Sequence, residues 1–384
     1  MNNTNIKSES KPVFEPIKFS HTIGRDFNST LKKRVRAYFK DNNISKYANF
    51  NMKLKTVFML SLYFVPYFLM ITGVVTSIWA MTICWSLIGF GMAGIGMGII
   101  HDANHGAYSK NKRTNYLLGR VMNLVGTFAP NWKIQHNVLH HTYTNIHEYD
   151  EDVDQPVPII RFTPHDKYRK IHRFQFLYAW FFYSFMTVSW ITVKDFQQIF
   201  RYRKMGLTKT ESEKFGPLLT ELLLSKVIYF GYILVLPLIF IDVPWWGILL
   251  FLLLKHLIAG FSLAIVFILA HVVPETSFPV ANKNGEIENN WAIHQLETTS
   301  NFGPNSRIFQ WFIGGLNYQV EHHLFPNICH VHYRNLSKIV RETALEFGLP
   351  YYSEPTFLSA VKSHYKMLQR LGKPTAKATV KSNI

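Results

Sequence analysis

The chain has 384 residues, of which 48% are hydrophobic and 15% aromatic, and its formal net charge is +17 at pH 7. This apolar content argues against an ordinary soluble enzyme and for a membrane protein. The basic charge does not indicate a nucleic-acid partner, because basic loops that border membrane spans account for it. Two cysteines are too few for a disulfide framework, which agrees with a reducing compartment.

The N-terminal arm, residues 1–50, is polar and basic and has no signal-peptide pattern, so we expect it to be cytoplasmic. From Asp26 the pattern predicts an amphipathic helix with Asp26 or Asn28 as its N-cap. Leu31 and Val35 fall on its apolar face. Such a helix suits either an anionic membrane surface or packing onto the rest of the protein, and the pattern does not choose between them.

Four apolar segments predict an all-α integral membrane protein. Residues 56–100 contain no Asp, Glu, Lys, Arg or His, and a span needs about 20 apolar residues, so this stretch holds two spans. A second apolar pair is interrupted at residues 242–244. We therefore expect two transmembrane hairpins and a cytoplasmic helical cap that holds the functional site. The four spans are expected at about 56–76, 78–100, 226–243 and 245–270.

Three short clusters contain seven of the histidines. The first and second clusters each have two histidines four residues apart, a spacing that places both on one face of a helix. Imidazole is the commonest metal ligand in proteins, so the clusters predict a metal site. The first cluster holds His101 and His105, the second His136, His140 and His141, and the third His322 and His323.

The composition of the clusters restricts the metal. Neither spaced pair has the Glu of a zinc protease motif, and Cys84 and Cys329 do not have zinc-site spacing. Seven imidazoles are too many for one ion and suit two. A nitrogen-rich site with open positions fits redox-active iron better than magnesium or calcium.

The three clusters, in this order and spacing, resemble the histidine boxes of membrane fatty acid desaturases. The third one, Gln-x-x-His-His at 319–323, resembles the front-end, linoleoyl-CoA-desaturase-like branch. The resemblance runs from about Thr56 to Gly348. It implies two iron ions, O2 as a co-substrate, and insertion of a cis double bond into a fatty acyl chain carried by coenzyme A or a lipid. It also implies an eighth ligand, His271, and a possible ninth, Gln319.

The resemblance assigns further roles to neighbouring polar groups. Asp102, Asn145 and Glu321 are expected to orient the imidazoles through hydrogen bonds. The haem-binding string His-Pro-Gly-Gly of cytochrome-b5-fused relatives is absent, so the electron donor is expected to be a separate protein of ferredoxin or cytochrome b5 type. Membrane lipids are expected partners as well. A basic cytoplasmic face suits an acidic donor, and equally the phosphates of coenzyme A or lipid headgroups.

The remaining histidines and one acidic run receive weaker assignments. His294 is a lesser ligand candidate, whereas the others are interpreted as solvated residues. The acidic run at 148–154 is interpreted as a solvated loop, with contact to a basic group of substrate or donor as the alternative. The histidines in the solvated group are His21, His147, His165, His172, His330, His332 and His364.

The membrane topology follows from the distribution of Lys and Arg and from the number of crossings between the histidine clusters. Lys and Arg are absent from the turns near Thr76 and Pro244, so these turns face outward and the catalytic face is cytoplasmic. Residues 174–193 are of span length and rich in aromatic residues. If they crossed, the third cluster would lie across the membrane from the other two, so we interpret them as interfacial.

The expected organisation is an arm at 1–50, a membrane desaturase domain at 51–348, and a cytoplasmic C-terminal helix and tail at 349–384. A lipid or carotenoid hydroxylase or ketolase of the same histidine-box type is the main alternative function. A metal transporter is disfavoured, because its ligands would lie within the spans.

Overall fold

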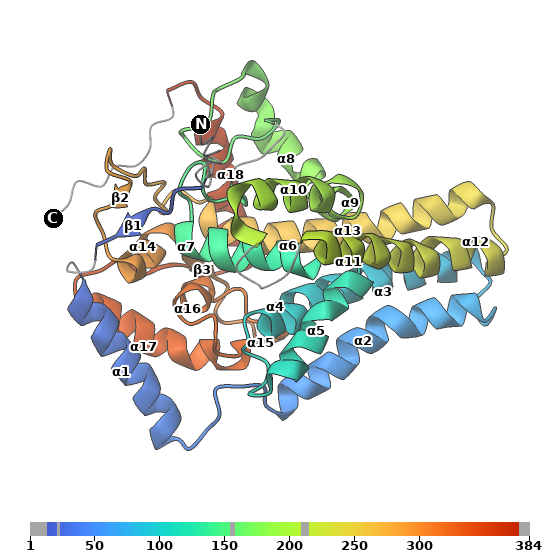
Figure 1. The fold of residues 1–384 in the computed structure, drawn as a ribbon, viewed down its shortest axis with the longest axis horizontal. Coiled ribbons are helices and arrows are strands. Elements are labelled where there is room, and N and C mark those ends of the chain that lie inside the picture. Colours follow the sequence, from blue (N-terminus) through green and yellow to red (C-terminus); the bar gives the residue numbers. More distant parts are fainter. Residues whose placement is uncertain (1–13, 21–23, 154–157, 209–214, 376–384) are drawn as a thin grey trace, which may run out of the picture.

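The computed structural model describes residues 14–20, 24–153, 158–208 and 215–375, and these residues are mostly helical (Figure 1). His21, Asp154 and the ends of the arm and tail lie outside them. The first half of the chain contains α1 (Arg25–Asp41), α2 (Phe50–Ile71), α3 (Ile78–Gly94), the π-helix η1 (Ile95–Ile100), α4 (His101–Asn104), α5 (Lys112–Leu124), α6 (Ala129–Lys133), the π-helix η2 (Ile134–His140), α7 (His141–Tyr143), the 3₁₀-helix η3 (Lys170–Phe174) and α8 (Gln175–Tyr183).

The second half continues the helical pattern. It contains α9 (Met186–Ser189), the π-helix η4 (Trp190–Lys194), α10 (Asp195–Met205), α11 (Phe215–Phe230), the π-helix η6 (Gly231–Val235), α12 (Leu236–Phe240), α13 (Trp245–His271), α14 (Trp291–Thr298), α15 (Arg307–Phe312), α16 (Gln319–Leu324), the 3₁₀-helix η7 (His330–His332), α17 (Tyr333–Glu346) and α18 (Phe357–Leu371).

Two short parallel strand pairs depart from the all-α expectation. β1 (Lys18–Phe19) pairs with β2 (Glu286–Ile287), and β3 (Ser300–Phe302) pairs with β4 (Tyr352–Glu354). Each pair joins segments that are distant in sequence. They are too short to produce the alternating pattern by which a sequence reveals a strand.

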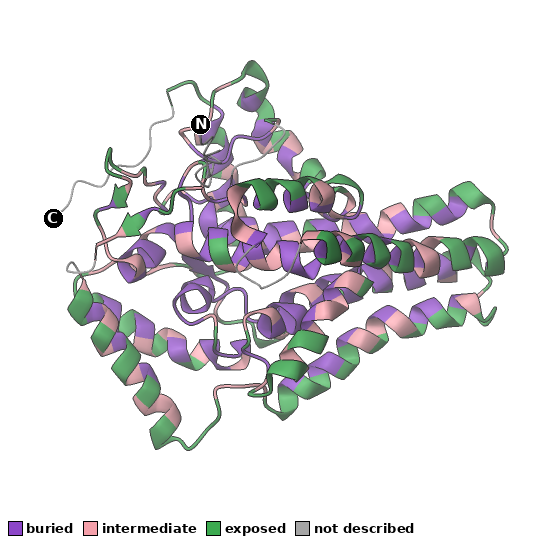
Figure 2. Ribbon diagram, viewed as in Figure 1, coloured by how far each residue is buried: buried purple, intermediate pink, exposed green. Residues whose placement is uncertain are grey.

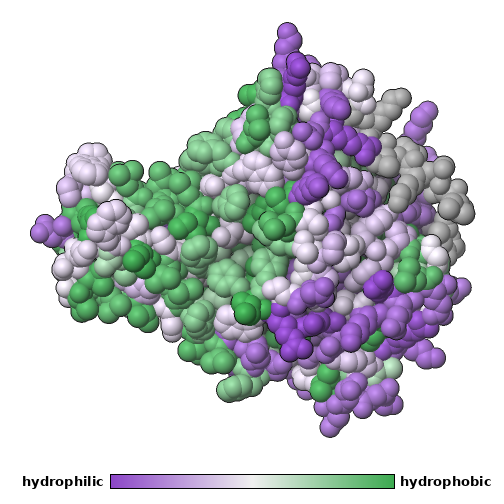
Figure 3. All heavy atoms as spheres, turned by 180° about the vertical axis from the view of Figure 1, so that it is seen from behind, coloured by the Kyte–Doolittle hydropathy of each residue, from purple (hydrophilic) through white to green (hydrophobic). Residues whose placement is uncertain are grey.

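Four helices are long and apolar enough to cross a membrane, as expected, and their bounds are Phe50–Ile71, Ile78–Asn104, Phe215–Phe240 and Trp245–His271. The first begins before residue 56, and the third begins well before residue 226. These helices project together to one side in Figure 1. From behind, apolar surface covers that half of the molecule and polar surface covers much of the other half (Figure 3).

Glycines allow the spans to pack closely. α3 lies against both α2 and α13. A Cβ atom added at Gly89 would lie 2.8 Å from the Lys255 carbonyl oxygen of α13, and one at Gly91 would lie 2.9 Å from the Tyr63 nitrogen of α2. These glycines therefore serve helix packing.

The ionisable pair within the fourth span is held inside the bundle. Lys255 Nζ donates to the hydroxyl of Tyr229 at 2.8 Å, and that hydroxyl lies 2.6 Å from His256 Nε2. Both Lys255 and His256 are buried. The lysine therefore does not extend along its helix to the surface.

Helix α1 packs against α17. Its buried residues Phe27, Leu31 and Val35 join a core cluster that contains Leu336 and Val340 of α17. This favours packing onto the protein over a membrane-surface role for the apolar face. The predicted N-caps are wrong, because the N-cap is Gly24, whose φ of 71° is a left-handed conformation that glycine adopts readily.

The aromatic segment at 174–193 is bent. The helical segments Lys170–Tyr183 and Met186–Met205 meet at 65° across a short break. α9 and α8 pack against α13. The segment is thus a broken span or a re-entrant piece by its geometry.

Candidate metal centre

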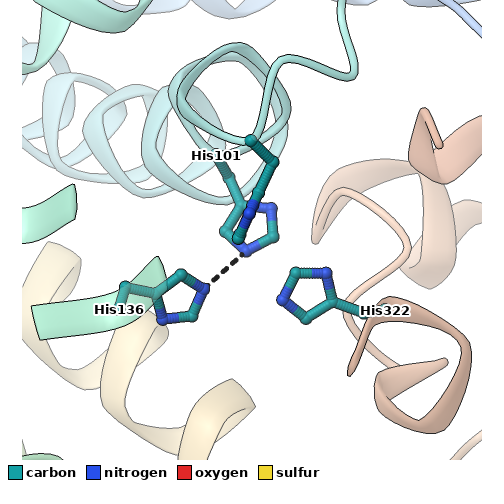
Figure 4. Close-up of side chains that lie close together, drawn as sticks. His101, His136 and His322 are labelled. Atoms are coloured by element: carbon teal, nitrogen blue, oxygen red, sulfur yellow. Dashed lines mark hydrogen bonds between the residues drawn. The ribbon is translucent and has the colours of Figure 1, made fainter. Parts of the chain in front are cut away.

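The three histidine clusters come together in the interior, where burial is most extensive (Figure 2). His101, His105, His136 and His322 form a first histidine set, whose ligand atoms all lie within 4.8 Å of one another. The rings of His101, His136 and His322 approach from three separate segments of the chain and point toward one another (Figure 4). The Nε2 atoms of His101 and His136 are 3.2 Å apart.

His141 links this set to a neighbouring one. Its Nε2 atom lies 3.2 Å from Nε2 of His136 and 2.9 Å from Nε2 of His322. Nitrogens bound to one metal ion at about 2.1 Å and at right angles would lie about 3 Å apart. The observed spacings are therefore compatible with ligands that share an ion.

The second cluster is built on a π-helix, which changes the geometry expected from its spacing. In a π-helix the backbone hydrogen bonds join residues five apart, so such residues overlie one another. The Nε2 atoms of His136 and His141 accordingly meet, while His140 also belongs to a second group of ligands with His271 and His323. His136 and His140 still lie close enough to hold an ion together with Asp152.

A second histidine set consists of His140, His271 and His323, again with ligand atoms within 4.8 Å. All three rings are buried. The Nε2 atom of each has no hydrogen-bond partner among the described residues. Three buried imidazole nitrogens that converge without partners are costly unless an ion binds them, so this arrangement fits a metal.

The opposite ring nitrogens of the second histidine set are all engaged. Nδ1 of His140 lies 3.0 Å from the Asp150 carboxylate, Nδ1 of His323 lies 2.8 Å from Oε1 of Gln295, and Nδ1 of His271 lies 3.3 Å from the Thr298 carbonyl oxygen. Each partner is an acceptor, so each Nδ1 carries the proton and donates it. The Nε2 lone pairs are then free for a metal ion.

Burial controls the charge of the rings. It lowers the pKa of His136, His141, His322 and His323, and neighbouring imidazoles lower it further, so these rings are neutral. Burial also disfavours the protonated form of His140. The Asp150 carboxylate outweighs this effect, so the pKa of His140 is raised. Neutral imidazole is the form that binds metal ions.

Asp102 forms its hydrogen bond with His330, which the sequence pattern indicated as solvated, and not with the ligand candidate His101. Its Oδ2 atom accepts a hydrogen bond from Nδ1 of His330 at 2.8 Å, and Nζ of Lys55 lies 2.7 Å from Nε2 of His330. The Asp102 Oδ1 atom lies 3.8 Å from Nδ1 of His101, which is too long for a hydrogen bond. His330 is therefore buried within a polar chain that ends at Asp102, next to His101 in the sequence.

The other two predicted orienting groups contact different partners. The Asn145 side chain donates to the His271 backbone oxygen at 2.9 Å, which holds the end of α13 but not the ring. The Glu321 carboxylate accepts from Asn301 and Tyr351, at 2.8 Å and 3.0 Å. Burial raises the pKa of Glu321 to about 7. The expectation that these two side chains bond to imidazoles is not met among the described contacts.

Several histidines interpreted as solvated are buried. His172, His332 and His364 have little exposed surface, and His364 bonds to Tyr183 and to the Val272 carbonyl oxygen. His294 is buried outside the groups that could hold a metal ion. Isolated histidines carry no sequence signal that separates burial from exposure.

The acidic run after the second cluster is buried at its centre, although Glu148 is exposed. Asp150 and Glu151 are buried, Asp150 supports His140, and Glu151 accepts hydrogen bonds from Gln198 and Tyr202. The preferred interpretation is thus wrong. The signal that could have found Asp150 is the presence of a carboxylate run directly after a metal-binding motif.

An apolar cavity of about 410 Å³ reaches the first histidine set. His101, His136 and His322 are part of its wall. So is Gln319, which is buried beside them. Most of the remaining lining is aliphatic or aromatic, including Met92, Trp132, Phe182, Met186, Leu263 and Phe267. A long apolar chain could therefore reach the histidines while shielded from water.

The fold and site define a helical membrane protein with a buried, histidine-rich centre at the wall of an apolar cavity. The sequence matches the family model for fatty acid desaturases over residues 76–355. It is 35% identical over 366 residues to an sn-1 linoleoyl-lipid 6-desaturase of Synechocystis sp., which covers 94% of this chain and 98% of that protein. An enzyme of the same name from Arthrospira platensis is also 35% identical, over 94% and 96% of the two chains.

An acyl-lipid (8-3)-desaturase of Physcomitrium patens is 34% identical over 93% of this chain and 74% of its own length. The chain therefore belongs to the fatty acid desaturase family, within its front-end branch. It is an oxidoreductase that desaturates fatty acyl chains.

Proposed function

We propose that the protein inserts a cis double bond into a fatty acyl chain esterified to a membrane lipid, using O2 and two external electrons at a centre of two iron ions. The observation that carries this proposal is the pair of buried histidine sets beside an apolar cavity. The names of the relatives, which act on acyl lipids, support the lipid-bound substrate over acyl-CoA.

The two histidine sets assign the ligands. His101, His105, His136 and His322 would hold one ion, and His140, His271 and His323 the other, with His141 between them. Gln319 is a weaker candidate ligand, since its amide oxygen is neutral and it lies in the cavity wall beside His322. When bound, the irons supply the redox chemistry that breaking unactivated C–H bonds requires.

The protein's own groups prepare this chemistry. The apolar lining excludes water and holds the acyl chain against His101, His136 and His322. Asp150, Gln295 and the Thr298 carbonyl fix the ring orientation in the second histidine set. Related histidine-box hydroxylases and ketolases are disfavoured by the family membership, and a transporter by the position of the ligands at the ends of the spans or outside them.

A topology with both histidine-bearing helix ends on the cytoplasmic side is supported by several features. The second and fourth spans, Ile78–Asn104 and Trp245–His271, both end at the site, with His101 and His271. The turns at 72–77 and 241–244 carry no Lys or Arg. The second and third clusters meet at His141 and His322, which supports an even number of crossings between them and a bent segment Lys170–Met205 that stays on one side.

This topology completes the proposed organisation. The four spans form two hairpins beneath a cytoplasmic helical cap, with the arm at 1–50 and the C-terminal helix and tail at 349–384 on the same side. The domain at 51–348 carries the reaction. A separate ferredoxin or cytochrome b5 type donor supplies the electrons.

The test is the fatty acid profile of a host that expresses the protein and can reduce it. A new unsaturated acyl chain, present with the native protein under air and absent with the His322→Ala variant, is the expected result. An unchanged profile with native protein that is membrane-inserted and iron-loaded would contradict the proposal.

A further inference from the structure

The apolar cavity meets the exterior along the bent segment between α8 and α10. Three of its lining residues, Phe182, Ser189 and Gln197, are exposed, whereas those near the histidines are mostly buried. Phe182 is 37% exposed. These three residues therefore mark the mouth of the cavity, which is formed by the break between α8 and α9, the π-helix η4 and the start of α10.

The surface around the mouth is of the kind that contacts lipid. Phe181, Val193 and Phe200 belong to the same bent segment and are 62%, 49% and 48% exposed. Trp190 and Lys194, which also line the cavity, lie close together, with Nζ 5.6 Å from the indole ring. Tryptophan and lysine are typical of the level where hydrocarbon meets headgroups.

The charge of the polar lining residues is informative. Gln135 and Asp152 lie beside His136 and His140, whereas Lys194 and Gln197 belong to the bent segment at the mouth. Among the described lining residues Lys194 is the sole Lys or Arg, and the same lining holds two carboxylates, Glu151 and Asp152. The several phosphates of coenzyme A would require a cluster of basic side chains, as anion recognition usually does. An ester and a headgroup of low charge need only a few hydrogen-bond donors.

We propose that this mouth admits an acyl chain sideways from the bilayer while the chain stays esterified to a membrane glycerolipid, with the ester held at Lys194 and Gln197. The proposal rests on the desaturase function proposed above and specifies the route of its substrate. The apolar part of the mouth, with Phe182 and Ser189, receives the tail. The hydrogen-bond donors of Lys194 and Gln197 hold the ester at about the same membrane depth as the esters of neighbouring lipids.

The experiment uses the full-length enzyme in liposomes that contain a labelled acyl glycerolipid, together with a reducing system. Ser189→Cys is compared with Val193→Cys, a neighbouring exposed position that does not line the cavity. Both native cysteines are buried. A bulky methanethiosulfonate reagent is attached to each variant after folding, so the same folded sample is measured before labelling, after labelling and after release of the label by a thiol.

Labelled Ser189→Cys should lose at least about tenfold in kcat/KM for the glycerolipid and recover on release, whereas labelled Val193→Cys should stay near the native value. Iron content should not change in either. Full turnover by labelled Ser189→Cys, or faster conversion of labelled acyl-CoA than of glycerolipid by the native enzyme, would overturn the proposed route. Failure of the native enzyme to convert either substrate would instead contradict the proposed function.

Discussion

Nδ1 of His330 lies 2.8 Å from the carboxylate of Asp102, the residue that directly follows the first metal-ligand candidate, His101. The other nitrogen of His330 lies 2.7 Å from Nζ of Lys55, which is buried in the first span. A buried carboxylate needs hydrogen-bond donors or a compensating positive charge. His330 donates to Asp102, and Lys55 supplies the positive charge nearby. Asp102, Cys329 and His330 also lie close enough to hold an ion, and the ammonium of Lys55 lies on the other ring nitrogen of His330.

Lys55→Met should destabilise the protein by about 3–5 kcal/mol and reduce its iron content, because it leaves Asp102 and His330 buried without their cation. Thermal unfolding and metal analysis of the purified variant measure both effects. Lys53→Met changes an exposed lysine on the same helix and should alter stability by no more than about 0.5 kcal/mol. Equal behaviour of the two variants would show that the polar chain does not support the site.

Asp150→Asn should weaken metal binding by about 10–100-fold, since the amide is a neutral and poorer acceptor for Nδ1 of His140. Competition with a chelator of known affinity gives the change. Glu148→Gln in the same acidic run provides the control, because Glu148 is exposed. If the two variants retained metal equally, the assigned support of His140 would be wrong.

His271→Ala should abolish turnover and remove about half of the bound iron, because His271 is one of the three rings in the second histidine set. The first histidine set stays intact in this variant. His165→Ala, which alters a ring bonded to the Phe278 carbonyl oxygen, should keep the native iron content. Full iron content in the His271 variant would exclude it as a ligand.

Gln319→Ala should lose most activity, whereas Gln319→His should retain a measurable part by restoring a nitrogen donor at similar reach. Gln319 lies in the cavity wall beside His322, which is consistent with weak binding to a metal or to a water in its ligand sphere. Turnover assays on the two variants compare them directly. Activity near the native level for the alanine variant would reduce Gln319 to a structural neighbour.

The sequence predicted the features whose characteristic residues are concentrated in short segments. Seven histidines in three clusters predicted the centre, and uninterrupted apolar runs predicted the spans. The sequence spacing alone could not show that the three histidine clusters meet in the fold. The partition of His136 and His140 depends on the π-helix η2, and π-helices have no strong local sequence signal.

The supporting residues were harder to predict, because their roles arise from tertiary contacts. Lys55 and His330 are 275 positions apart and look like ordinary solvated residues in the sequence. Asp150 was hidden in an acidic run that resembles a surface loop. The α1 helix shows the same limit, since its amphipathic pattern fits a membrane surface and the α17 helix equally well.

The central claim is desaturation at a centre of two iron ions held by the two histidine sets. The most direct measurement is the iron content of purified, catalytically active protein, taken together with O2-dependent conversion of an acyl lipid. The account predicts about two irons per chain, with conversion lost in proportion when the iron is removed and restored when it is returned. Full activity with stoichiometric zinc and without iron would contradict it.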